Sequence, residues 1–353
     1  MIGNVKAVRR ILSGHDPADD PNYVLGNSKA ATLERVFTSP NGDHNFHRSR
    51  LSRYSWARRA TWLASAGMAV VLVVFFLTQF GLSSSTPPPT AQAATPRLLA
   101  YSPVSENARD VLIEIASQIR TNASSLNRAE YRYVKTESWS LSTRIDGRQV
   151  RSAVLPEIRE VWRAPDGSGR VRIIPGTPEF PSDEARRAWQ DEERPTVKAS
   201  DETFHAGELV TMYPSTLPTD ADAMAALFAA GHPASNGPAE TLVAATDLYL
   251  EQTPAAPARA AVLEVLANTS GLQLQGRTVD RIGRSGLAFS VDSSMSGLPT
   301  RYILIIDPTD GRLLDQEQVL ITSAGALNVP IPSTISYVVF ADAAHTSDTR
   351  NRT

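Results

Sequence analysis

Histidine and cysteine are residue types that often bind metals or carry out catalysis, and this chain has few of them at useful spacing. None of the 353 residues is a cysteine, which excludes thiol catalysis, cysteine-based zinc sites, disulfides and a lipid-modified cysteine anchor. No two histidines share a predicted helix at the spacing of metal ligands. We therefore predict no metal site. The histidines are His15, His44, His47, His205, His232 and His345.

The catalytic motifs that can be recognised in a single sequence are also missing. The chain contains no H-E-x-x-H, G-x-S-x-G, S-x-x-K or G-x-x-x-x-G-K pattern. Asp307 and Asp310 bracket a proline, which is typical of a turn rather than of a catalytic pair of carboxylates. We predict no catalytic residue and no cofactor. Carboxylates far apart in the sequence can still meet in space, so an active site assembled from distant segments stays open.

Aromatic residues are the remaining candidates for a binding site. Six of them lie on predicted strands: Tyr131, Tyr133, Trp139, Trp162, Phe289 and Tyr337, of which the first four are the predicted ligand-binding residues. One interpretation is that they pack the core. The other is that they line a cleft for an apolar ligand, since a curved antiparallel sheet covered by helices leaves such a cleft. The sequence does not distinguish between the two.

The elements that would position these residues fall into separate runs. Apolar residues at helical spacing predict a first helix that begins at Ser102, with Pro103 in its first turn. Strands follow, and then a charged segment, residues 182–195, which we expect to be a loop or a short surface helix. Three helices begin near residue 217, the first capped by Thr219, and strands return near residue 272. This order predicts an α+β fold with a curved, mainly antiparallel sheet packed against helices.

A separate apolar segment lies at residues 60–82, and no charged residue occurs between residues 60 and 96. Twenty-three residues of helix extend about 34 Å, enough to cross a hydrocarbon core of about 30 Å. A secretory signal has a short leader and an apolar run of only about 7–15 residues, whereas 59 residues precede this segment. We therefore predict a permanent transmembrane helix.

Charge on either side of this helix predicts its orientation. Residues 1–59 carry ten Lys/Arg and five Asp/Glu, a net +5, which leaves −7 for the remainder of a chain of net charge −2. The positive-inside rule places this basic end in the cytoplasm and the C-terminal part outside the plasma membrane. We expect membrane lipid, rather than nucleic acid, to be the partner of the basic end. The predicted interface residues are Arg53, Trp56, Arg58, Arg59 and Trp62.

The predicted organisation has five parts. A partly disordered cytoplasmic tail is followed by the transmembrane helix, a Pro-rich spacer, an extracytoplasmic α+β domain and a disordered C-terminus. Their ranges are 1–59, 60–82, 83–100, 101–345 and 346–353, respectively.

Several motifs carry a resemblance to a known family. They are "YRYVKTESW", "REVWRAPDGSGR", "LPTDADAMAALFAA", "ARAAVLEVLANTSGLQLQGRTVDRIGRSGLAFSV" and "LIIDPTDGRLLDQEQVL". Together with the tail–helix–spacer layout they resemble an uncharacterised actinobacterial family of single-pass membrane proteins with an extracytoplasmic α+β domain. Members of that family are often encoded beside sigma factors of the extracytoplasmic-function type. The tail differs by an extra segment, "VFTSPNGDHNFHRSRL", so no partner of the tail carries over.

The resemblance implies no catalytic residue. The outer domain is also similar, at the level of the fold, to periplasmic lipoprotein-carrier and anti-sigma-regulator domains. We therefore expect a non-enzymatic sensor or regulatory protein of the envelope, whose outer domain binds a protein or an apolar ligand. A membrane-tethered carrier of lipid or lipoprotein is the alternative, and a cell-envelope hydrolase is the third. Inside the cell, the tail either binds a sigma or anti-sigma factor or only holds to anionic lipid.

Overall fold

The computed structural model describes residues 95–121, 130–146, 149–180, 182–190, 198–327 and 329–350. All of them belong to one of two compact units, Ser55–Thr353. The predicted tail, the transmembrane helix with its interface residues, and most of the spacer lie outside the described residues. Within the described ranges, no helix has both the length and the apolar character needed to cross a bilayer.

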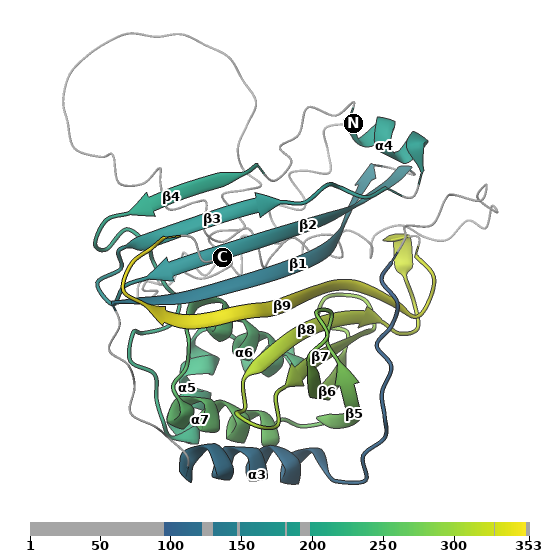
Figure 1. Cartoon of the computed structure of the whole chain (residues 1–353). Coiled ribbons are helices and arrows are strands. Elements are labelled where there is room, and N and C mark those ends of the chain that lie inside the picture. The colour runs from purple at the N-terminus through teal and green to yellow at the C-terminus, as the bar shows by residue number, and fades with distance from the viewer. Residues whose placement is uncertain are drawn as a thin grey trace, which may run out of the picture. The chain divides into compact units, whose positions relative to one another are not determined.

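Nine strands of the described chain form one antiparallel sheet, in the order β4-β3-β2-β1-β9-β8-β7-β6-β5 (Figure 1). This confirms the predicted α+β class and the antiparallel sheet. The strands are β1 (Tyr131–Asp146), β2 (Gln149–Arg163), β3 (Gly169–Pro175), β4 (Ser200–Phe204), β5 (Gln273–Val279), β6 (Ser285–Ser293), β7 (Thr300–Ile306), β8 (Leu313–Leu320) and β9 (Ser333–Thr346).

The last strand joins the two halves of the sheet. Strand β9 pairs with β1 on one side and with β8 on the other, so that segments far apart in the sequence become neighbours. Its pairing shifts register at Lys135/Thr136 and at Gln318/Val319. Such bulges bend a strand and increase its twist. In Figure 1 the strands β5–β8 run at a steep angle to β1–β4, and the sheet bends around the helices.

Helices cover one side of this sheet, which we call the helix face. They are α3 (Ala108–Thr121), α5 (Ala221–Gly231), α6 (Ala239–Glu251) and α7 (Ala256–Ala267). Apolar side chains from the helices and strands form the largest core, which includes Leu112, Leu242, Leu263, Phe289 and Leu304. A further helix, α4 (Asp183–Gln190), lies within the charged segment, and two short 3-10 helices occur at Ala234–Asn236 and Gly325–Leu327.

Two predicted helix starts are wrong. Helix α3 begins at Ala108 rather than at Ser102, because Ser102 forms an isolated bridge with Arg277; its N–H donates to the Arg277 carbonyl at 2.8 Å. The backbone N–H of Arg109 donates to Asn107 at the true start. In α5 the cap is Asp220, one residue after the predicted Thr219. A local pattern cannot show that an extended segment pairs with a strand far along the chain.

Residues Thr95–Ser102 cross the other side of the sheet, and we call them the strap and this side the strap face. Leu99 and Tyr101 pack against the apolar residues of β6–β8 there. The Thr278 hydroxyl donates to the Ala100 carbonyl at 2.9 Å, and Arg281 donates to the Arg97 carbonyl at 2.7 Å. The end of the predicted spacer is therefore attached to the sheet.

Candidate functional site

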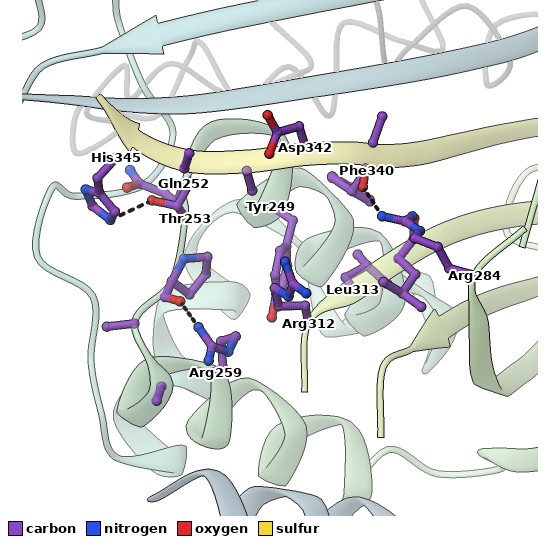
Figure 2. Close-up of a pocket in the computed structure, with 17 residues that line it drawn as sticks. Tyr249, Gln252, Thr253, Arg259, Arg284, Arg312, Leu313, Phe340, Asp342 and His345 are labelled. Carbon is purple, nitrogen blue, oxygen red and sulfur yellow. Dashed lines mark hydrogen bonds between the residues drawn. The ribbon is translucent and has the colours of Figure 1, made fainter. Parts of the chain in front are cut away.

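A pocket with a volume of ≈ 470 Å³ lies on the helix face beneath the C-terminal half of β9 (Figure 2). The turn between α6 and α7 forms one side, and the turns that precede β6 and β8 form the other. The residues labelled in Figure 2 are Tyr249, Gln252, Thr253, Arg259, Arg284, Arg312, Leu313, Phe340, Asp342 and His345.

The apolar wall of the pocket comes from three elements. Tyr249 from α6 meets Phe340 from β9 edge to face, with ring centroids 5.9 Å apart, and Leu313 from β8 adjoins them. The Tyr249 hydroxyl donates to the Gly311 carbonyl at 3.4 Å, and burial raises the pKa of Tyr249. The Tyr249 side chain is therefore uncharged at physiological pH and forms part of the apolar wall.

Three arginines supply the polar side of the pocket, and they differ in how their charge is compensated. Arg284 donates to Asp280 at 2.7 Å, and Arg312 donates to Asp310 at 2.5 Å. Arg259 donates only to carbonyl oxygens, those of Asp310 at 3.0 Å and Pro254 at 2.8 Å. Among the described residues, no carboxylate forms an ion pair with Arg259. It is the cation best placed to bind an anion.

The turn between β7 and β8 explains how these groups are positioned. Asp307 accepts a hydrogen bond from the Thr309 N–H at 2.8 Å, which is turn chemistry, as predicted for this pair of aspartates. Gly311 has φ +71°, and a Cβ there would lie 2.9 Å from Leu263 and 3.0 Å from Ile119. The glycine thus lets the turn approach the helices closely, and the Asp310 carbonyl reaches Arg259.

The rim of the pocket is formed by the end of β9 and the end of α6. The Thr253 hydroxyl and the His345 Nε2 are 3.2 Å apart. Burial, together with the nearby charge of Arg132, lowers the pKa of His345 below its usual value, so the imidazole is neutral at pH 7. Arg132 donates to Gln252 and to the Ser215 carbonyl.

This arrangement suits binding. Guanidinium groups recognise carboxylate and phosphate oxygens, and an apolar wall beside them accommodates a hydrocarbon or aromatic portion. A pocket of this kind takes a small amphipathic anion.

A second polar network lies in the core. It combines the residue types of a catalytic site, but its histidine is buried. His232 contacts Glu240 through Nδ1 at 2.9 Å and Tyr213 through Nε2 at 3.1 Å. Tyr213 also donates to the Ala244 carbonyl at 2.9 Å. The His232 side chain is 1% exposed, so a substrate cannot reach it. The network ties the segment before α5 to α6.

The four aromatic residues predicted as a ligand lining lie elsewhere. Tyr133 on β1 and Trp162 on β2 are directly paired, with ring centroids 4.9 Å apart, and the Tyr133 hydroxyl donates to Glu160 at 2.7 Å. Trp139 stacks on Tyr337 in a separate cluster, with centroids 6.0 Å apart. Tyr131 lies at the start of β1. None of the four lines the pocket beneath β9, and their binding role stays a prediction.

Sequence reasoning did not find the pocket arginines, although two of them share a local signal. Arg284 and Arg312 each follow a glycine of a turn that leads into a strand, in "GRSG" and "GRLL". Arg259 lies within a helix and has no such local sequence signal. Comparison with family models and with curated proteins gave no match, so the likeness to the actinobacterial family of single-pass membrane proteins stays a prediction.

Proposed function

We propose that this protein is a membrane-anchored, non-enzymatic sensor or regulator of the cell envelope whose outer domain binds a small amphipathic anion beneath β9. The observation that carries the proposal is Arg259, a guanidinium whose acceptors among the described residues are carbonyl oxygens, beside the wall of Tyr249, Leu313 and Phe340. The anchor, its orientation and a link to a sigma-factor system enter as predictions from the sequence.

The alternative, a tethered lipid or lipoprotein carrier, draws on the curved sheet wrapped around helices. A carrier of acyl chains needs a large apolar cavity between sheet and helices. Here Leu242, Leu248, Leu263 and their neighbours fill that space, and the gap between α6, α7, β7 and β8 has a volume of only ≈ 10 Å³. The packed core favours the sensor over the carrier.

A hydrolase is the third candidate, and it would require a nucleophile beside a base in an accessible cleft. Two pairs come nearest: the Thr253 hydroxyl and His345 Nε2, 3.2 Å apart at the pocket rim, and His232 with Glu240, where the histidine side chain is 1% exposed. The accessible pocket also presents three arginines, which hold anions and do not take up protons at neutral pH. Binding is therefore the function that this pocket supports.

Filling the pocket tests the proposal. Ala343 lines it from β9 and is exposed, so Ala343→Trp adds a bulky side chain there without disturbing the core. Val279 on β5 is exposed and outside the pocket, which makes Val279→Trp the matched control. Both would replace the natural copy in the native organism, and transcript levels would be compared with those of a deletion strain.

We expect the Ala343→Trp strain to show the transcript changes of the deletion strain, while Val279→Trp matches the wild type. Equal thermal unfolding of both purified variants excludes misfolding. If a well-folded Ala343→Trp protein supports wild-type transcript levels under every condition in which the deletion has an effect, the pocket is not the functional site.

A further inference from the structure

Three arginines of β1 and β2 gather on the helix face beside the rim of the pocket, and we call them the arginine cluster: Arg132, Arg159 and Arg163. Arg132 and Arg163 are directly opposite each other in the register of the two strands. Arg159 lies four residues before Arg163, and alternate residues of a strand share a face, so it points to the same side. Like charges directly opposite on adjacent strands repel each other.

Burial increases the free-energy cost of this repulsion. Arg163 is only 4% exposed, and its Nε has no hydrogen-bond partner among the described residues. One other nitrogen of the same guanidinium, Nη1, donates to the Val210 carbonyl at 3.3 Å. A buried N–H of a charged group without an acceptor costs stability, so an acceptor is expected at this position.

Among the described residues, fewer carboxylates than arginines lie at the cluster. Two carboxylates, Glu157 and Glu251, interact with the cluster, against three guanidinium groups. Glu251 is already engaged, because its carboxylate accepts hydrogen bonds from the backbone N–H groups of Met212 and Tyr213, at 2.9 and 3.2 Å. Burial raises the pKa of Glu157, and the nearby charge of Arg159 opposes this shift.

Arginine does not lose its proton at neutral pH, so the repulsion within the cluster is not removed by deprotonation. Burial lowers the pKa of Arg163 to about 10, and the neighbouring arginines add to the shift, yet the group is still charged at pH 7. An external anion with several oxygens would supply the missing charge and the missing acceptor together. The neighbouring loop also exposes apolar side chains, Val210 at 61% and Met212 at 45%.

We propose that the arginine cluster is a second binding site, which takes the phosphate group of an anionic amphiphile, with Val210 and Met212 against its apolar part. The phosphate oxygens accept hydrogen bonds from Arg163 and Arg159. This site adjoins the rim of the pocket beneath β9, where Arg132 donates to Gln252, but Arg159 and Arg163 do not line that pocket. The same chemistry is shared by free phosphate and by a phospholipid headgroup, and the two sources are separable by experiment.

The test uses the full-length chain in a neutral detergent and isothermal titration with three probes. The probes are inorganic phosphate, dihexanoyl phosphatidylglycerol and, as the zwitterionic control, dihexanoyl phosphatidylcholine. The variants are Arg159→Gln, which is only partly buried and therefore less disruptive, and Arg163→Met. Arg301→Gln on β7, which removes an arginine paired with Asp292 away from the cluster, is the matched control.

We expect wild-type protein to bind phosphatidylglycerol more tightly than phosphatidylcholine, and both cluster variants to lose at least tenfold in affinity. Arg301→Gln should bind within twofold of wild type. If inorganic phosphate binds through the cluster and phosphatidylglycerol binds no more tightly, the cluster is a phosphate site. The proposal that its ligand is an amphiphile would then be wrong. Failure of wild type to bind either anion, or equal binding by wild type and Arg159→Gln, would overturn the site itself.

Discussion

The two faces of the sheet bury charges of opposite sign and deal with them differently. On the strap face, Asp315 and Glu317 lie two residues apart on β8 with fully buried side chains. On the helix face, Arg132, Arg159 and Arg163 gather on β1 and β2. The acidic pair is covered by the strap, where Tyr101 packs, whereas the arginines adjoin an exposed loop.

A buried acid and a buried arginine differ in how their charge can be neutralised. Burial, with the nearby Glu317, raises the pKa of Asp315 well above its usual value, so this acid can neutralise itself by keeping a proton. Glu317 is compensated by Arg281, which donates to both of its oxygens at 2.6 and 2.9 Å. For Arg163, no ion pair of this kind with a carboxylate occurs among the described residues. Both carboxyl oxygens of Asp315 lack a hydrogen-bond partner among the described residues, but a proton removes their charge, whereas Arg163 keeps its charge and is therefore a candidate for ligand binding.

The largest expected effect comes from breaking the ion pair on the strap face. Glu317→Gln leaves the Arg281 guanidinium largely buried without its carboxylate, so the free energy of unfolding should fall by about 3–5 kcal/mol in urea titrations. Asp292→Asn, which breaks the exposed pair with Arg301, is the control and should cost less than about 1 kcal/mol. Equal losses of unfolding free energy in the two variants would show that the buried Glu317–Arg281 pair stabilises the protein no more than an exposed pair does.

A smaller loss is expected where the strap meets the sheet edge. Gly276 has φ +126°, and a Cβ there would lie 2.2 Å from the Ser102 carbonyl oxygen, so Gly276→Ala should cost about 2–3 kcal/mol and expose the strap to proteases. Gly283 has φ +90° with open space around it, so Gly283→Ala reports backbone strain alone, about 1 kcal/mol. The contact between strap and sheet would be dispensable if both alanine variants lost the same stability and resisted proteolysis equally.

The pH dependence of stability isolates Asp315. Its pKa is higher in the folded state than in the unfolded chain, so its contribution to stability is fully present below about pH 4 and is lost as the pH rises through the folded value. Asp315→Asn should therefore remove a downward slope of at most about 1.4 kcal/mol per pH unit from the wild-type curve, and should be the more stable protein at high pH. Parallel stability curves for variant and wild type would contradict a protonated Asp315.

The smallest effect is expected in the arginine cluster. Replacing a buried charge that lacks full compensation by an apolar residue of similar size is often neutral, so Arg163→Met should change the free energy of unfolding by less than about 1 kcal/mol in phosphate-free buffer. Urea titration with and without phosphate is the measurement, and phosphate should stabilise only the wild type. A loss of several kcal/mol without phosphate would mean that the protein already satisfies Arg163.

The sequence predicted those features that depend on local periodicity. Alternation of period two and helical spacing are properties of single segments, so the separate runs of strands and helices were sufficient to predict an antiparallel α+β fold. The start of α3 was wrong because Ser102 pairs with Arg277, a contact that no local pattern contains. Asp315 and Glu317 likewise have the spacing of an outward-facing polar pair, but both are buried on the face where the strap, more than 200 residues earlier in the chain, packs.

The candidate site was less predictable than the fold, because it depends on contacts between segments that are far apart in the sequence. Arg259, Arg284 and Arg312 come from a helix and two turns, and they meet only because β9 closes the sheet above them. Tyr133 and Trp162 were correctly expected on strands. Their pairing with each other depends on the register of β1 and β2, which the sequence alone did not provide.

The most direct test of the difference between the two faces is a crystal structure of the protein soaked in tungstate, a tetrahedral oxyanion that stands in for phosphate and is located by its anomalous scattering. We expect a tungstate peak within hydrogen-bond distance of Arg159 and Arg163, and no ion beside Asp315 on the strap face. A cluster with no peak, while tungstate binds elsewhere in the same crystal, would contradict it.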